Sequence, residues 1–177
     1  ALASGTNTLV ANVTDAIAHA SGVSSSIVIT LDTVAPSAPT VALSSDTGLS
    51  SSDKNTSNGQ VNITGLEGGD LWQYSINGST YNSGATLAST VTTATLAASL
   101  FSQGSNTVTI LETDVAGNTV TNSFTYTLDT VAPSVVVTKP ISHNQLQLYV
   151  DDAGGSGLSS ITPAGTAFTV HTSNGST

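Results

Sequence analysis

Carboxylate side chains are the residues of this sequence best suited to chemistry. The 177 residues include 11 Asp and Glu but only two Lys and Arg, so the formal net charge is -9. Carboxylates that lie close together with so little basic charge repel one another unless a cation joins them. Calcium suits such groups, because it takes roughly six to eight oxygen ligands from carboxylates, amides, backbone carbonyls and water. The sequence therefore points first to cation binding.

The same composition excludes several classes of partner and site. Two basic side chains cannot neutralise a row of phosphates, which excludes an electrostatic nucleic-acid binder and binding to anionic membrane surfaces. Cys is absent, so no disulfide or thiolate site can form. No apolar run approaches the roughly 18 residues that span a bilayer, and we expect no membrane insertion. Because Met is also absent, we expect the chain to be processed or cut from a longer protein.

Catalysis finds little support in the motifs. The three histidines, His19, His143 and His171, are far apart and lack the i, i+4 partner of a zinc-binding helix. No Gly-x-Ser-x-Gly nucleophile turn occurs. The carboxylates of Glu112 and Asp114 could suit glycoside hydrolysis, but beside a linker cation binding is the better use for them. We expect the protein not to be an enzyme.

The elements that must position these acids are β-strands. Thr and Val favour strands, whereas Gly, Asn, Ser and Asp favour the turns between them. Ala and Leu accumulate only at 89–101, and the Thr-rich first half of this segment argues against a long helix. The predicted class is all-β, with short strands and frequent turns.

An internal repeat sets the predicted organisation. The heptapeptide Leu-Asp-Thr-Val-Ala-Pro-Ser at 31–37 recurs at 128–134, a spacing of 97 (128 minus 31). The similarity extends upstream, where 5–8 matches 104–107 and Thr14-Asp15 matches Thr113-Asp114. A period near 100 residues is the size of one β-sandwich module. We predict the C-terminal part of a module at 1–34, a complete module at 35–131 and the N-terminal part of a divergent third module at 132–177.

Alternating side chains predict the strands. In the complete module we expect strands at 40–44, 60–65, 72–77, 81–82, 91–96, 106–113 and 119–128, and in the third at 135–137, 145–150 and 167–171. Trp72, Tyr74 and Ile76 share one face of their strand, which predicts that Trp72, the single Trp, packs in the core.

Several segments together resemble a known family. They are 41–48, 58–67, 72–75, the segment Glu-Thr-Asp-Val-Ala-Gly-Asn at 112–118, and the repeated linker. The set resembles the bacterial Ig-like repeats of giant surface adhesins and biofilm-associated proteins. It covers 31–134 well, 1–30 by their closing hairpin and 135–177 loosely. The resemblance implies a secreted array of tandem Ig-like β-sandwich modules, joined by short Pro-containing linkers and often stiffened by calcium. The first copy departs from the pattern, because 16–19 replace the Val-Ala-Gly-Asn turn, so no calcium site is carried over to Asp15.

Strand direction sorts the acids by the end of the module at which they lie. The candidate metal ligands at the upstream junction are Asp32, Glu67, Asp70, Glu112, Asp114 and Asn118, and those at the downstream junction are Asp46, Asp53 and Asp129. We expect calcium (Ca2+) at the junctions, where it would fix the angle between modules. Each acid also has a simpler interpretation. Asp114 could stabilise its own turn by accepting hydrogen bonds there without binding a metal, and Asp46 and Asp53 could be solvated surface acids.

Three functions remain open from the sequence. The first is a structural spacer of an extracellular adhesin or filament on the bacterial cell surface, whose partners are neighbouring modules of the same or identical chains. The second is a self-polymerising filament or sheath subunit, in which split modules are completed by strand exchange. The third is a carbohydrate-binding module, which would need exposed aromatic side chains at Trp72, Tyr74, Tyr81 and Tyr149. The ligand at the distal end of such an array is not specified.

Overall fold

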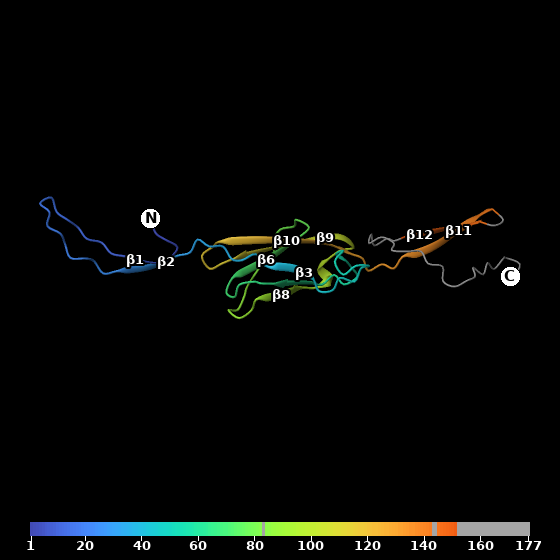
Figure 1. The fold of residues 1–177 in the computed structure, drawn as a ribbon, viewed down its shortest axis with the longest axis horizontal. Helices are drawn as coiled ribbons and strands as arrows, with labels where there is room; N and C mark the ends of the chain where they lie inside the picture. Colours follow the sequence, from blue (N-terminus) through green and yellow to red (C-terminus); the bar gives the residue numbers. More distant parts are fainter. Residues whose placement is uncertain (83, 143–144, 152–177) are drawn as a thin grey trace.

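Three parts follow one another along the long axis of the molecule (Figure 1). A computed structural model describes residues 1–82, 84–142 and 145–151. The first part is an antiparallel hairpin of β1 (Gly5–Leu9) and β2 (Ile27–Leu31). The central part has two sheets. The last part is an antiparallel hairpin of β11 (Ser134–Ser142) and β12 (Gln145–Asp151).

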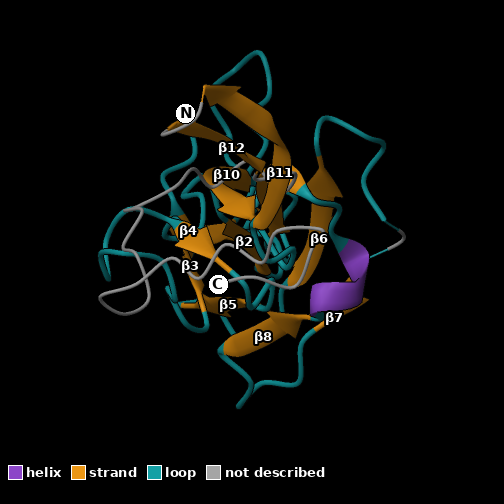
Figure 2. Cartoon of the chain, turned by 90° about the vertical axis from the view of Figure 1, so that its right-hand side faces the viewer, coloured by secondary structure: helices purple, strands orange, loops and turns teal. Residues whose placement is uncertain are grey.

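The central part is a β-sandwich whose two layers are visible along the long axis in Figure 2. The smaller sheet has the order β3-β5-β8 and comprises β3 (Thr40–Leu43), β5 (Val61–Thr64) and β8 (Thr93–Leu96). The larger has the order β4-β10-β9-β6-β7 and comprises β4 (Asn55–Thr56), β10 (Thr119–Leu128), β9 (Gly104–Thr113), β6 (Leu71–Ile76) and β7 (Ala85–Thr86). All pairs are antiparallel except β4 with β10. The predicted all-β class is confirmed.

The core lies between the two sheets because one face of each strand is apolar. In β9, Val108 and Ile110 are fully buried, and in β5 the same holds for Val61 and Ile63. Fully burying a side chain of this size contributes roughly 1.5–3 kcal/mol. The remaining buried hydrophobic residues are Val41, Leu66, Leu87, Leu96, Phe101, Tyr126 and Leu128. Trp72 packs against this cluster, as its alternation predicts.

Most predicted strands form within one or two residues of their expected bounds. The strand expected at 135–137 is longer, because β11 extends to Ser142. The strand expected at 81–82 is wrong. Instead, the backbone N–H of Asn82 donates to the Tyr74 carbonyl at 3.0 Å, while the side-chain oxygen of Asn82 accepts the Tyr74 N–H at 2.6 Å. The strand β7 begins only at Ala85. The short strand β4 was not predicted. Within 89–101 only a 3-10 turn, Ala98–Leu100, is helical, which agrees with the expectation that no long helix forms there. The segment 167–171 lies outside the described residues.

Candidate functional site

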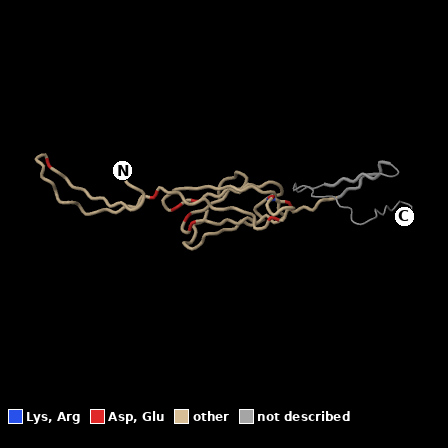
Figure 3. Tube along the Cα trace, in the orientation of Figure 1, with Lys and Arg blue, Asp and Glu red and all other residues tan. Residues whose placement is uncertain are grey.

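Acidic residues gather at the two ends of the sandwich (Figure 3). At the upstream end, which faces the 31–37 linker, the loop between β5 and β6 carries Glu67 and Asp70. The end of β9 and the following turn carry Glu112 and Asp114. We call Glu67, Asp70, Glu112 and Asp114 the upstream acidic cluster.

Glu112 is a buried acid in a core position. The alternation of β9 places it on the same face as Val108 and Ile110, and its exposed fraction is 0%. Its Oε1 accepts the backbone N–H of Glu67 at 2.6 Å, whereas its Oε2 is buried with no hydrogen-bond partner among the described residues. Burial raises the pKa of Glu112, the Glu67 N–H partly opposes this, and the charges of Asp70 and Glu67 raise the pKa further.

Asp70 repeats this pattern beside Glu112. It is 5% exposed, and its Oδ2 also lacks a hydrogen-bond partner within the described chain. Burial raises the pKa of Asp70, and the charges of Glu67 and Asp114 add to the effect. Two buried carboxyl groups with raised pKa values at one end of a core are costly unless a proton or a cation neutralises them.

Two hydrogen bonds join the linker to this end of the module. The carboxylate of Glu67 accepts the backbone N–H of Ser37 at 2.9 Å. The Asn118 side-chain amide donates to the backbone carbonyl of Asp32, with 3.4 Å between nitrogen and oxygen. Because Glu67 also donates its own N–H to Glu112, the buried acid is connected to the linker through one residue.

Asp114 holds its own turn. Its Oδ1 accepts the N–H groups of Ala116 and Asn118, each at 2.8 Å, and its Oδ2 accepts the side-chain amide of Asn118 at 2.8 Å. These bonds, chiefly the one from the Asn118 side chain, lower the pKa of Asp114. The simpler interpretation of Asp114 as a turn residue matches this geometry.

The downstream acids lie in the loop between β3 and β5 and after β10. Asp53 accepts the N–H groups of Asn55 at 2.9 Å and Ser50 at 3.1 Å, and its pKa is lowered chiefly by the Asn55 N–H. The Oδ2 of Asp46 accepts the Lys54 N–H at 2.9 Å, while its Oδ1 is buried with no hydrogen-bond partner in the described part of the chain.

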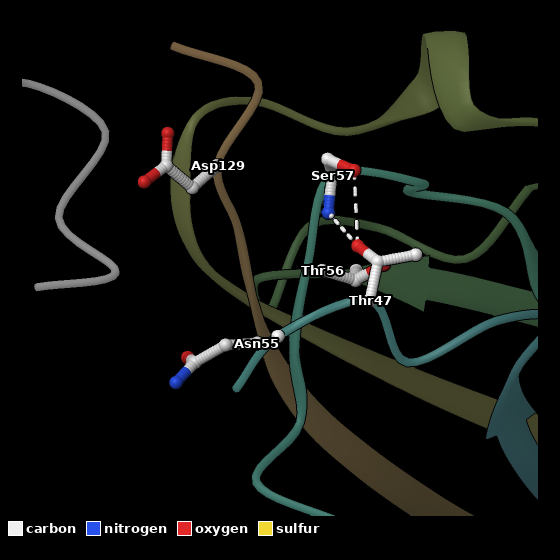
Figure 4. A pocket seen from close by; sticks show the side chains of 6 residues that line it. Thr47, Asn55, Thr56, Ser57 and Asp129 are labelled. Carbon is white, nitrogen blue, oxygen red and sulfur yellow. Dashed lines mark hydrogen bonds between the residues drawn. The ribbon is translucent and has the colours of Figure 1, made fainter. Parts of the chain in front are cut away.

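Asp129 borders a small polar pocket at the same end (Figure 4). It accepts the N–H of Val131 at 2.9 Å through its Oδ1. The other lining residues are Thr47, Gly48, Asn55, Thr56 and Ser57. Thr47 and Ser57 are already bonded to each other in this pocket, at 2.9 Å between hydroxyl oxygens, so its polar groups are partly engaged.

Calcium binding therefore has different support at the two ends. Among the described residues, no three His, Asp or Glu side chains are gathered as a ready metal site. At the upstream end, however, the orphaned buried oxygens of Glu112 and Asp70 fit a cation, which would need further oxygens from side chains that turn towards it. Both acids were predicted as ligands from the sequence, but their burial was not predicted. The burial of Glu112 could have been predicted from its spacing, because it follows Val108 and Ile110 at every second residue and so lies on the same face of the strand.

The aromatic side chains form no exposed sugar platform in the described residues. Trp72 and Tyr74 pack against the core, with ring centroids 6.1 Å apart. Trp72 lies directly opposite Glu112 in the pairing of β6 with β9, so it is placed as a natural reporter of that acid. Tyr81 is 39% exposed, but one aromatic side chain makes no platform. The side chain of Tyr149 lies outside the described residues.

Comparison with protein families agrees with the sandwich and its linkers. A family model described as bacterial Ig-like domain matches residues 33–130, more than half of the chain. The chain belongs to the bacterial Ig-like domain family. Such domains are often modules of surface proteins and are typically not catalytic. The comparison with curated proteins gave no match. No helix in the described residues of this Ig-like protein has the length and apolarity needed to cross a bilayer.

Proposed function

We propose that the protein is a structural spacer of an extracellular bacterial adhesin or surface filament, and that calcium stiffens its Ig-like modules where they meet. The observation that supports this most is the pair of buried, unpartnered carboxylate oxygens of Glu112 and Asp70 beside the linker. The chain has almost no basic side chains to neutralise them, so the counter-charge must come from solution. Extracellular modules bind calcium with Kd values of about 10⁻⁴–10⁻³ M, which suits a medium rich in calcium.

The residues that would hold the ion also explain the stiffening. Glu112 and Asp70 would supply the buried oxygens, Glu67 is bonded to the linker, and Asp32 lies within it. Calcium supplies the positive charge that allows these carboxylates to stay ionised together. Glu67 would then be held at both ends, by Glu112 through its N–H and by Ser37 through its carboxylate. The ring of Pro36 fixes one backbone angle of the linker and removes further freedom.

A distance measurement tests the proposed stiffening. The protein has no Cys, so spin labels can be placed at Ser26→Cys in the first hairpin and Thr121→Cys on β10, both exposed positions. We expect a narrow distance distribution in millimolar calcium and a broad one after chelation, with magnesium unable to replace calcium. The same labels in a Glu112→Gln background should give the broad distribution throughout. Identical widths with calcium and with chelator would refute the proposal.

One observation also favours the filament alternative, because the β1–β2 hairpin exposes apolar side chains such as Leu9 and Ile27, at 43% and 63%. Measuring the mass of the full chain in solution separates the two functions. A spacer is expected to be monomeric at micromolar concentration. Assemblies that grow with concentration would support the polymerising subunit instead.

A further inference from the structure

The first hairpin has an apolar face with no partner in the described residues. β1 and β2 form a two-stranded sheet and pair only with each other. Their apolar side chains are exposed or half-buried, with Leu9 at 43% and Ile27 at 63%. Isolated two-stranded hairpins are marginally stable in water, so this face is expected to be covered in the working protein.

The hairpin has the same register as β9–β10. Gly5 pairs with Leu31 as Gly104 pairs with Leu128, and Leu9 pairs with Ile27 as Val108 pairs with Phe124. The first strand is thus offset by 99 residues (104 minus 5) and the second by 97 (128 minus 31).

Local hydrogen bonds repeat as well. The Asn7 side-chain amide donates to the carbonyls of Ala3 and Gly5 at 2.7 and 2.9 Å. At the equivalent position, Asn106 donates to the carbonyls of Ser102 and Gly104 at 2.7 and 2.9 Å.

The turns repeat too, although their sequences differ. The Oδ1 of Asp15 accepts the N–H groups of Ile17 and His19 at 3.0 and 2.8 Å, which matches the bonds within the Asp114 turn. Ala18 adopts a φ of 69°, where Gly117 has 94°. His19 Nδ1 lies 3.2 Å from Asp15 Oδ2, in the place of the Asn118 amide. The turn of the first hairpin therefore has the same hydrogen bonds as the Asp114 turn, although its sequence at 16–19 differs.

The faces of the two hairpins correspond in polarity. Four of the β9–β10 positions that face the core, Val108, Phe124, Tyr126 and Leu128, have counterparts within β1 and β2. Their equivalents in the first hairpin are Leu9, Ile27, Ile29 and Leu31, all apolar. In the module this face is covered by the sheet β3-β5-β8, and β9 and β10 also pair along their outer edges with β6 and β4. Face and edges are thus both open in the first hairpin.

We infer that the hairpin of residues 1–31 is a docking surface for the opening strands of another Ig-like module, a segment equivalent to 35–99 of this chain that lacks its own closing hairpin. The register, the asparagine side-chain hydrogen bonds, the turn and the apolar face are all those of the closing hairpin of a sandwich. The opening strands at 40–96 of a second copy are not the occupant, because they are already closed by β9 and β10 of that copy. The inference extends the spacer proposal to a second module but does not depend on calcium.

The test grafts such opening strands onto the full chain. Because the first strand is offset by 99, a copy of residues 35–99 placed directly before Ala1 continues into Leu2 where the module continues into Phe101. We expect hydrogen exchange of the β1 and β2 amides to slow by at least about 100-fold on grafting. Ile29→Asp in the grafted chain should abolish this protection without changing exchange in 35–131. The matched control Ile17→Asp lies in the exposed turn and should leave the protection intact.

A second graft controls for poor packing between the added strands and the side chains of the first hairpin. It carries Leu2→Phe, Leu9→Val, Ile27→Phe and Ile29→Tyr, which restore the core side chains of the module. If its β1 and β2 amides exchange as fast as in the ungrafted chain, the inference is wrong. It is also wrong if the ungrafted chain self-associates with these amides protected and Ile29→Asp dissociates it, because the occupant would then be a second copy. Either result leaves the calcium measurements on Glu112 unaffected.

Discussion

At the scale of single residues, the upstream end of the module depends on Glu112 and Asp70. Both are buried, and both have an oxygen without a hydrogen-bond partner in the described structure. In calcium-free solution their charges oppose folding, because ionised carboxylates lose more by burial than protonated ones. Their raised pKa values express that penalty, and it leads to a pH dependence.

We predict that the calcium-free protein becomes less stable as the pH rises from 5 to 8. A carboxyl group whose pKa is raised in the folded state binds its proton more tightly there than in the unfolded chain. The stability it confers is present below its ordinary value, 3.8 for Asp and 4.5 for Glu, and is lost as the pH rises through the raised pKa. The lowered pKa values of Asp53 and Asp114 act in the opposite sense, and only below about pH 4.

Denaturant unfolding in chelator at pH 5 and pH 8 measures this dependence. Glu112→Gln cannot ionise, so we expect a smaller difference between the two pH values in this variant. Asp15→Asn in the exposed hairpin turn is the matched control and should keep the full difference. A wild-type protein that is less stable at pH 5 than at pH 8, as it would be if all its acids had lowered pKa values, would contradict the assignment.

At the scale of elements, the closing hairpin β9–β10 joins the two layers. Tyr126 on β10 is 2% exposed, its ring contacts that of Phe101 edge-on at 5.5 Å, and its hydroxyl donates to the carbonyl of Gly59 at 3.1 Å. Gly59 lies in the loop that leads into β5, so this bond connects the closing hairpin to the strand at the centre of the opposite sheet.

Tyr126→Phe is predicted to destabilise the module by about 1–2 kcal/mol. The change leaves the ring in place but removes the donor from a buried carbonyl. For a domain near 100 residues this lowers Tm by roughly 5–10 °C. Tyr81→Phe, where the hydroxyl makes no hydrogen bond within the described residues and the side chain is 39% exposed, should not change Tm. Equal melting of the two variants in calorimetry would show that the hydroxyl bond is not needed.

The sequence was most informative where pairing is local. The alternation in 106–113 and 119–128 and the Asp114 turn predicted the β9–β10 hairpin, because its partners are close along the chain. Contacts between distant segments were harder to predict. The burial of Asp70 and the hydrogen bond of Glu67 to Glu112 need the β5–β6 loop to meet the end of β9, and β4 forms only because β10 lies beside it. A strand was predicted at 81–82, but the Tyr74 N–H is accepted there by the side-chain oxygen of Asn82 and not by a backbone carbonyl.

At the scale of the whole molecule, the negative charge is concentrated at the ends of the sandwich rather than spread over its sides (Figure 3). The outer face of β9 and β10 is instead lined by hydroxyl groups. Thr107 bonds Thr125, and Thr109 bonds Ser123, each at 2.9 Å between oxygens. Neutral sides and acidic ends are what an array of modules held together by cations would need. Calcium is therefore expected to stabilise the Ig-like module through the upstream acidic cluster.

The direct test of this stabilisation is thermal unfolding of the full chain, followed by Trp72 fluorescence in calcium and in chelator. Trp72 lies opposite Glu112 and is the only tryptophan, so the signal reports on the end of the core in question. Calcium at about 100 times its Kd should stabilise the folded state by about 2.7 kcal/mol. For a domain of this size Tm should then rise by roughly 10–20 °C, and Glu112→Gln should remove most of the increase. A Tm that is the same with calcium and with chelator, or an equal increase in the variant, would contradict the claim.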